Sequence, residues 1–233
     1  MNILITGVTR GIGKATALAL APSAKGMALC ARKTNELETL ARELKALNPQ
    51  LKLVLRATDC GLAAEVEAFA DEALTHLNRI DVLINNVGFF APSPILMEDA
   101  EQLQKHFSVN VATPYLLYKK IAPVMQNQRS GHIINICSVA SIQTIVNAGS
   151  YCVTKAALLS LNNIMREETR PFGVKVTAVL PGSTLTSSWD GTEISADKFV
   201  QAGDVAQSIK QLLQLSHGAN VDQIVITPQS GQV

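Results

Sequence analysis

The clearest candidates for catalytic residues are a tyrosine and a lysine in the stretch "SYCVTKAAL" at 150–158. In a helix, Tyr151 and Lys155 lie one turn apart on one face, with about 5–6 Å between their Cβ atoms. A free phenol has a pKa of about 10 and is a poor base at neutral pH. A nearby ammonium favours the phenolate, and a tyrosine so tuned can take a proton from an alcohol or give one to a carbonyl. The pair also fits an ordinary helix surface, and the rest of the chain decides between the two interpretations.

A glycine-rich turn stands near the start of the chain. The sequence "TGVTRGIG" at 6–13 follows the apolar run "NILIT" at 2–6 and opens a helical pattern. In a dinucleotide-binding turn of this kind, Gly7 allows the tight turn, Gly11 lets the backbone approach a pyrophosphate, and Gly13 lets the helix pack closely on the sheet. The free N–H groups at the helix start favour phosphate. The turn therefore predicts a dinucleotide site.

The end of the second apolar run carries bases where an acid is expected for NAD. Folds specific for NAD place a carboxylate here, which accepts hydrogen bonds from the ribose hydroxyls. Residues 27–35 contain none, whereas Arg32 and Lys33 stand there and Arg10 stands inside the glycine turn. Cations at these places can converge on a 2′-phosphate, which the planar donor fork of arginine fits well. The pattern favours NADP (NADPH) over NAD as the cofactor.

The elements that must position these residues alternate along the whole chain. We expect strands at 2–6, 27–32, 51–57, 81–86, 132–138, 174–180 and 222–227, and helices at 11–21, 34–46, 62–77, 99–127, 151–170 and 204–215. Strands this continuously apolar are buried on both faces, which is typical of a parallel sheet covered by helices. The sequence therefore predicts an α/β fold, Rossmann-like and doubly wound, with a seven-stranded, mostly parallel sheet flanked by helices on both faces. We expect one domain over 1–233, with the irregular stretch 182–203 as its substrate loop.

Composition narrows the function further. The chain has 233 residues, 47% hydrophobic and 17% charged, with a formal net charge of +1. It can bury a large core and has no basic block for nucleic acid or an anionic membrane. The four cysteines have no metal-ligand spacing, and we expect free thiols in a reducing cytosol and no bound metal. No signal-peptide pattern and no long apolar segment is present, so a cytoplasmic protein without a membrane partner is predicted.

Several motifs together resemble the short-chain dehydrogenase/reductase family, in its single-domain, NADP-preferring type. They are "TGVTRGIG", "NNVG" at 85–88, "SVN" at 108–110, Ser138, "YCVTK" at 151–155 and "PGSTLT" at 181–186, in that family's order and spacing over 2–227. The resemblance implies an oxidoreductase that interconverts a carbonyl and an alcohol. It implies Tyr151 as the general acid/base and Ser138 as the donor that orients the substrate. Lys155 would bind the nicotinamide ribose and lower the pKa of the tyrosine, and Asn110 would hold a water that relays protons.

The same resemblance implies a wider set of cofactor-binding residues. Asp59 would contact the adenine, and the loop that begins at Pro181 would hold the nicotinamide carboxamide. The implied set is Thr6, Gly7, Thr9, Arg10, Gly11, Ile12, Gly13, Arg32, Lys33, Asp59, Cys60, Asn86, Val87, Gly88, Tyr151, Lys155, Pro181, Gly182, Thr184 and Thr186. Val87 replaces the family's usual alanine, Cys60 stands where a small aliphatic residue is more common, and the C-terminal "VITPQSGQV" departs from the common glycine-rich ending.

Two other functions share parts of this pattern. A non-catalytic NADP-binding regulator could have the same fold, although the intact tyrosine, lysine, serine and asparagine argue against it. A sugar-nucleotide epimerase or dehydratase shares the glycine turn and the Tyr-x-x-x-Lys spacing but needs an added substrate domain. The residues after the sixth strand are used up by one loop, one helix and one strand, which disfavours that interpretation.

Partners are inferred from apolar surfaces. The segments 89–97, 139–149 and 183–200 are mostly apolar and lack an arginine pair for a carboxylate, so a neutral apolar ketone, aldehyde or acyl thioester is expected as the substrate. The helices 99–127 and 151–170 are apolar on more than one face, which predicts a homodimer or homotetramer built on them. The family resemblance places a subunit interface there too.

Some residues lie outside every motif. The histidines at 76, 106, 132 and 217 are expected at the surface or at strand edges. Cys152 follows Tyr151 on the same helix but points about 100° around it, and it is expected to be a packing residue. Trp189, in the irregular loop, is interpreted equally well as ordinary packing of a flap or as an aromatic wall over the substrate.

Overall fold

The computed structural model describes residues 1–232, and Val233, the last residue of the predicted domain, lies outside the described residues. Its main strands are β1 (Asn2–Thr6), β2 (Gly26–Ala31), β3 (Lys52–Ala57), β4 (Val82–Asn85), β5 (Gly131–Ile136), β6 (Val174–Pro181) and β9 (Gln223–Ile226). They form one 7-stranded sheet in the order β3-β2-β1-β4-β5-β6-β9, with every pair parallel. The strand order reverses between β1 and β4, which is the switch point of a doubly wound sheet. The predicted Rossmann-like fold is confirmed.

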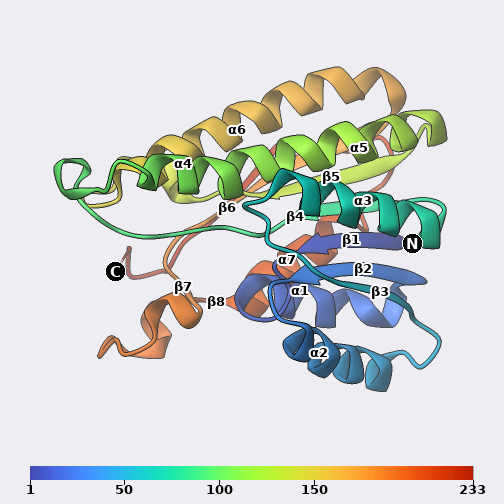
Figure 1. Cartoon of the computed structure of the whole chain (residues 1–233), viewed down its shortest axis with the longest axis horizontal. Coiled ribbons are helices and arrows are strands. Elements are labelled where there is room, and N and C mark those ends of the chain that lie inside the picture. Colours follow the sequence, from blue (N-terminus) through green and yellow to red (C-terminus); the bar gives the residue numbers. More distant parts are fainter. Residues whose placement is uncertain (233) are drawn as a thin grey trace.

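Helices cover both faces of this sheet (Figure 1). They are α1 (Gly11–Leu20), α2 (Thr34–Leu47), α3 (Ala63–Leu77), α4 (Gln102–Phe107), α5 (Thr113–Gln128), α6 (Gly149–Thr169) and α7 (Ala202–Leu212). Figure 1 shows α3, α5 and α6 on one face and α1, α2 and α7 on the other. Successive strand residues point to opposite faces, so Ile3 and Ile5 enter one core while Leu4 enters the other. Both cores need apolar residues, which is why the strands read as uninterrupted apolar runs. No helix in residues 1–232 combines the length and the hydropathy needed to cross a membrane.

The expected continuous helix over 99–127 is wrong in one respect. A π-helical segment, Ser108–Ala112, separates α4 from α5. The Thr113 hydroxyl donates to the carbonyl of Ser108 at 3.2 Å within this wider turn. Asn110 lies at the centre of the segment and is buried. Single π-helical turns of this kind concentrate at functional sites, and this one carries a predicted catalytic residue.

The segment 182–203 has more structure than the sequence indicated. Two short strands, β7 (Thr184–Leu185) and β8 (Val200–Gln201), pair in parallel as a small second sheet. Between them the Trp189 ring packs against the ring of Phe199, with centroids 4.9 Å apart. This contact agrees with the interpretation of Trp189 as ordinary packing of a flap, and its role as an aromatic wall over the substrate stays a prediction. Strands of two residues are too short to show a period, so the sequence could not reveal them.

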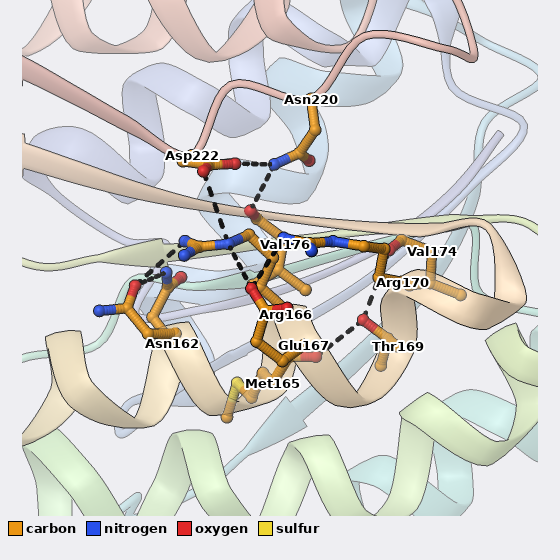
Figure 2. Close-up of polar contacts among 11 residues, drawn as sticks. Asn162, Met165, Arg166, Glu167, Thr169, Arg170, Val174, Val176, Asn220 and Asp222 are labelled. Carbon is orange, nitrogen blue, oxygen red and sulfur yellow. Dashed lines mark hydrogen bonds and ion pairs between the residues drawn. The ribbon is translucent and has the colours of Figure 1, made fainter.

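The edge strand β9 is tied to the body by polar contacts (Figure 2). Asn220 donates to the carbonyl of Val176 at 3.3 Å and to Asp222 Oδ1 at 2.6 Å. Arg166 Nε of α6 lies 3.7 Å from Asp222 Oδ2. A cavity of about 260 Å³ lies beside this network, at the amino end of β6. These contacts fix β9 at the amino ends of the strands, whereas the glycine turn lies at their carboxyl ends.

Candidate active site

The glycine turn has the geometry that its residues predict. Gly7 has φ +70°, a conformation that residues with side chains rarely adopt. A Cβ on Gly13 would lie 2.2 Å from the Gly7 carbonyl oxygen, so only glycine lets α1 begin this close to β1. A Cβ on Gly11 would lie 3.0 Å from Thr186 Cγ2, which shows that the loop after β6 reaches over the turn. The predicted glycine turn and the "PGSTLT" loop thus meet at the carboxyl ends of the strands.

The segment after β4 joins this turn to the residues on α6. The Thr6 hydroxyl accepts from the backbone N–H groups of Asn86 and Val87, at 3.1 and 3.0 Å. The Asn86 amide donates back to the carbonyls of Thr6 and Gly7, at 2.8 and 2.9 Å. A Cβ on Gly88 would lie 3.7 Å from Asn110 Oδ1 and 3.7 Å from Lys155 Nζ. The "NNVG" segment therefore connects the glycine turn to the part of the site that holds Asn110 and Lys155.

A cavity opens where the adenine end of a dinucleotide was predicted. Its volume is about 540 Å³, and it is lined by Arg32, Asp59, Gly61, Phe89, Glu101, Gln104, Lys105, Ser108 and Val109. Arg32 and Asp59 thus face the same space, as a shared cofactor site requires. Cys60 is instead buried, with its Sγ 4.0 Å from Cys30 Sγ.

One acid at this end was not among the residues predicted from the sequence: Glu36. Lys33 Nζ lies 3.0 Å from Glu36 Oε1. Hydrogen bonds from Lys33 and Thr9 hold the pKa of Glu36 below its usual range, and the Arg10 charge acts in the same direction. Glu36 is one residue past the stretch that lacks acids. It stands in the first turn of α2, where a carboxylate is common because it favours the helix dipole, so its position gave no separate signal.

The tyrosine and lysine lie in the first turns of α6, close to Ser138, which stands two residues after the end of β5. Lys155 is 4% exposed, and its Nζ donates to the Ile136 carbonyl at 2.9 Å. Nζ lies 5.8 Å from the centre of the Tyr151 ring. The Ser138 hydroxyl accepts from the N–H of Ala140 at 3.1 Å, and it lies close enough to the Tyr151 phenol to lower the pKa of that group. The structure therefore brings the predicted tyrosine, lysine and serine together.

Burial sets the protonation of this group. It lowers the pKa of Lys155 to about 8, a change that the neighbouring Cys137 thiol opposes. Burial raises the pKa of Tyr151 to about 12, and the Ser138 hydroxyl acts in the opposite direction. The Tyr-x-x-x-Lys spacing predicted a lowered tyrosine pKa, whereas the groups of the protein alone raise it. Tyr151 is thus a protonated phenol at neutral pH, which is the form that donates a proton to a carbonyl.

Asn110 braces the site through its side chain. It is fully buried, and its Oδ1 accepts from the N–H of Phe89 at 2.8 Å. Its Nδ2 donates to the Phe89 carbonyl at 3.0 Å and to the Thr154 hydroxyl at 3.1 Å. The π-helical segment, the loop after β4 and α6 are thus joined by one amide. Its predicted contact with a relay water stays a prediction.

Aromatic and apolar side chains surround the phenol. The Phe90 ring meets the Tyr151 ring edge-on, with centroids 4.7 Å apart. The loops that were expected to set specificity expose a rim of large apolar side chains: Phe89, Phe90, Ile95, Leu96, Met97, Ile142, Ile145 and Val146. Leu96 and Met97 are 94% and 77% exposed. An apolar rim around a polar centre favours a ligand with one polar group and an apolar body.

The expected surface or strand-edge position is wrong for two of the histidines. His132 lies in β5, is 7% exposed, and its Nε2 lies 2.8 Å from the Thr177 hydroxyl. His106 is fully buried against the site, with its ring 4.8 Å from the Phe89 ring between centroids. The spacing held a signal for His106, because it stands about one helical turn before Asn110 and so points the same way.

The chain is similar to known proteins along nearly its whole length. Residues 1–195 match the family model of the short chain dehydrogenases. The chain is 34% identical to the 3-oxoacyl-[acyl-carrier-protein] reductase of Synechocystis sp., over 85% of this chain and 79% of that protein. It is 28% identical to an uncharacterised oxidoreductase of Staphylococcus epidermidis, over 97% of this chain and 96% of that one.

Solved structures agree with this match. Levodione reductase superposes with a TM-score of 0.90 at 24% identity, over 97% of this chain and 95% of that one, which shows the shared fold. A metagenomic short-chain oxidoreductase in complex with NADP has a TM-score of 0.85 at 27% identity, over 98% and 97% of the two chains. With the glycine turn, the parallel sheet and the tyrosine–lysine helix in place, the chain belongs to the short-chain dehydrogenase family of oxidoreductases.

Proposed function

We propose that the protein is an NADP(H)-dependent oxidoreductase that interconverts a carbonyl and an alcohol by hydride transfer, with Tyr151 as general acid/base. The observation that carries this proposal is the grouping of the Tyr151 phenol with the Ser138 hydroxyl and the buried Lys155, whose Nζ lies 5.8 Å from the centre of the tyrosine ring. A protonated phenol and a hydroxyl that lie side by side can both donate hydrogen bonds to the same carbonyl oxygen. Neither has an evident use in binding alone.

The residues fit a dinucleotide, because side chains at Gly7 or Gly13 would fill the turn that its phosphates need. Bound NADPH would supply the hydride. The Ser138 hydroxyl would hold the substrate carbonyl oxygen, and Tyr151 would donate a proton to that oxygen. The Lys155 ammonium would bind the nicotinamide ribose and stabilise the phenolate that remains. In the reverse direction the same phenolate would accept the alcohol proton.

Arg32 is the residue to which we mainly attribute the preference for NADP over NAD. It lines the cavity together with Asp59, whereas Lys33 is occupied by Glu36. A guanidinium there suits a 2′-phosphate. The NADP in the metagenomic relative supports this choice. Glu36 should weaken it, because a carboxylate beside the phosphate repels charge of the same sign.

The proposed substrate is a neutral apolar ketone, aldehyde or 3-oxoacyl compound. The exposed apolar rim supports this class, as does the name of the Synechocystis relative. We also propose a homo-oligomer built on α4, α5 and α6, supported by exposed Leu103, Phe107, Tyr115, Val153 and Ile164. The four cysteines are free, which supports a reducing, cytoplasmic location.

The experiment is a panel of apolar and polar carbonyl compounds with NADPH, followed by absorbance of the reduced cofactor. We expect turnover with apolar ketones or aldehydes and slower turnover with NADH. Firm NADPH binding without turnover of any carbonyl would contradict the proposal and favour a non-catalytic NADP-binding regulator.

A further inference from the structure

His106 lies beside the catalytic tyrosine but in none of the motifs. It sits in α4 with 0% of its surface exposed. Its ring lies between the Phe89 ring, at 4.8 Å, and the Tyr151 ring, at 6.1 Å between centroids. A histidine is a costly way to fill an apolar gap, since both ring nitrogens need partners once buried. Its polar contacts therefore show what it does.

The hydrogen bonds assign the proton on this ring. The backbone N–H of Ala91 points at Nε2, at 3.3 Å. A peptide N–H only donates, so Nε2 must be the acceptor and carries no hydrogen. The hydrogen of the neutral ring is then on Nδ1, which lies 3.1 Å from the Gln102 carbonyl oxygen and 2.9 Å from Ser150 Oγ. The neutral ring thus links the loop after β4 to the start of α6.

Glu98 completes this connection at the first turn of α6. The residue before the helix, Ala148, offers no side-chain cap. The Ser150 hydroxyl and the Ser150 N–H both donate to Glu98 Oε1, at 2.8 and 3.1 Å. A carboxylate at a helix N-terminus is also favoured by the helix dipole. Tyr151 is the next residue, so this turn sets where its phenol lies.

We propose that His106 is a positioning residue: in its neutral form with the hydrogen on Nδ1, it locks the loop 89–98 onto the first turn of α6. The lock, completed by Glu98 and Ser150, fixes the Tyr151 phenol and the Phe90 ring that packs against it. The part of the inference that concerns turnover rests on the proposed carbonyl reduction. The lock itself is a property of the fold.

The lock opens when the ring is protonated. The titratable groups that face His106 are Glu98 from the loop and Tyr151 from α6. Burial lowers the pKa of His106, although the Gln102 carbonyl and the Glu98 charge oppose this. A second proton would go on Nε2, where it meets the Ala91 N–H, and two donors cannot bond. Tyr151 stays protonated over the same acid range, so it is not the source of a loss of turnover there, and the His106 variants show whether the histidine is.

Three variants test this. His106→Ala removes both links, His106→Asn keeps a donor on the Nδ1 side, and His106→Gln places an acceptor nearer Ala91. We expect His106→Ala to lower kcat by roughly 10²-fold, the effect of misplacing a catalytic group by about 1 Å. Each conservative variant should recover part of the loss. NADPH binding, measured by fluorescence, should stay within about twofold because the ring is not placed among the cofactor contacts.

His132→Asn is the matched control. It replaces another buried histidine, in β5, whose Nε2 bonds Thr177. It should lower stability without changing the acid limb of the kcat profile, whereas every His106 variant should remove or shift that limb. Equal acid limbs in wild type and His106→Asn would overturn the proposal.

Two measurements do not depend on turnover. Nitrogen NMR of the wild type at neutral pH should show a hydrogen on Nδ1 and none on Nε2 of His106. Amide hydrogen exchange of Ala91 and Ser150 should quicken in His106→Ala, and also in His106→Asn at the Ala91 side. The opposite tautomer, or unchanged exchange, would overturn the lock even in an active enzyme. No carbonyl reduction by the wild type would overturn the proposed function alone.

Discussion

Replacing Asn110 with leucine keeps the size of the side chain and removes its hydrogen bonds. Three would be lost: from the Phe89 N–H, to the Phe89 carbonyl and to the Thr154 hydroxyl, at 2.8, 3.0 and 3.1 Å. Each contributes about 1 kcal/mol net, and a partner left buried without a bond costs more, so the free energy of unfolding should fall by about 3–5 kcal/mol. For a chain of this size that corresponds to a Tm lower by roughly 10–15 °C. Turnover should fall too, because the loop that carries Phe89 would no longer be held to α6.

The assay is chemical and thermal denaturation, with turnover measured well below the Tm. Asn162→Leu is the control, since Asn162 is equally buried on α6 but bonds Asn135 instead, at 2.9 Å. The control should lose stability and keep its turnover. An Asn110→Leu protein with a Tm within about 2 °C of wild type would refute the view that this amide braces the site.

Three further predictions concern other parts of the molecule. Arg32→Asp should weaken NADPH binding by about 1.5–3 kcal/mol while affecting NADH less, and an unchanged preference in fluorescence titrations would remove Arg32 from the 2′-phosphate site. Burial holds the pKa of His132 at about 4 instead of 6.5, so its contribution to stability is full above about pH 6.5 and is lost as the pH falls towards 4, about 3 kcal/mol in all. The free energy of unfolding, measured by denaturation at several pH values in this range, should depend less on pH for His132→Gln than for wild type. The same pH dependence in both proteins would contradict the assignment. Wild-type protein should sediment as at least a dimer at micromolar concentration and Phe107→Glu with Ile164→Glu as smaller species, whereas a wild-type monomer of 24.9 kDa would end the oligomer proposal.

The sheet and the glycine turn were predictable because local sequence determines them. β1 is apolar at every position from Ile3 to Ile5, as only a strand covered on both faces requires. The backbone of Gly13 lies so close to the Gly7 carbonyl oxygen that no residue with a Cβ fits there. The glycine spacing therefore identified the turn before the structure was known. The tyrosine and lysine share a helix, and their spacing alone places them together.

The rest of the site depends on contacts between residues distant in sequence. Glu98, His106 and Ser150 meet only because α4 lies across the start of α6. No periodicity reports the π-helical segment around Asn110, since the chain on both sides of it has an ordinary helical pattern. The raised pKa of Tyr151 likewise reflects burial by neighbouring segments, which the Lys155 spacing could not show.

The most direct test of the proposed chemistry is the single-turnover rate of Tyr151→Phe. Phenylalanine keeps the ring that packs against Phe90 and removes only the hydroxyl that would move the proton. With NADPH saturating and its dissociation constant close to that of wild type, carbonyl reduction should slow by at least about 10²–10⁴-fold. A variant that binds NADPH normally and reduces the carbonyl at close to the wild-type rate would show that another group donates the proton.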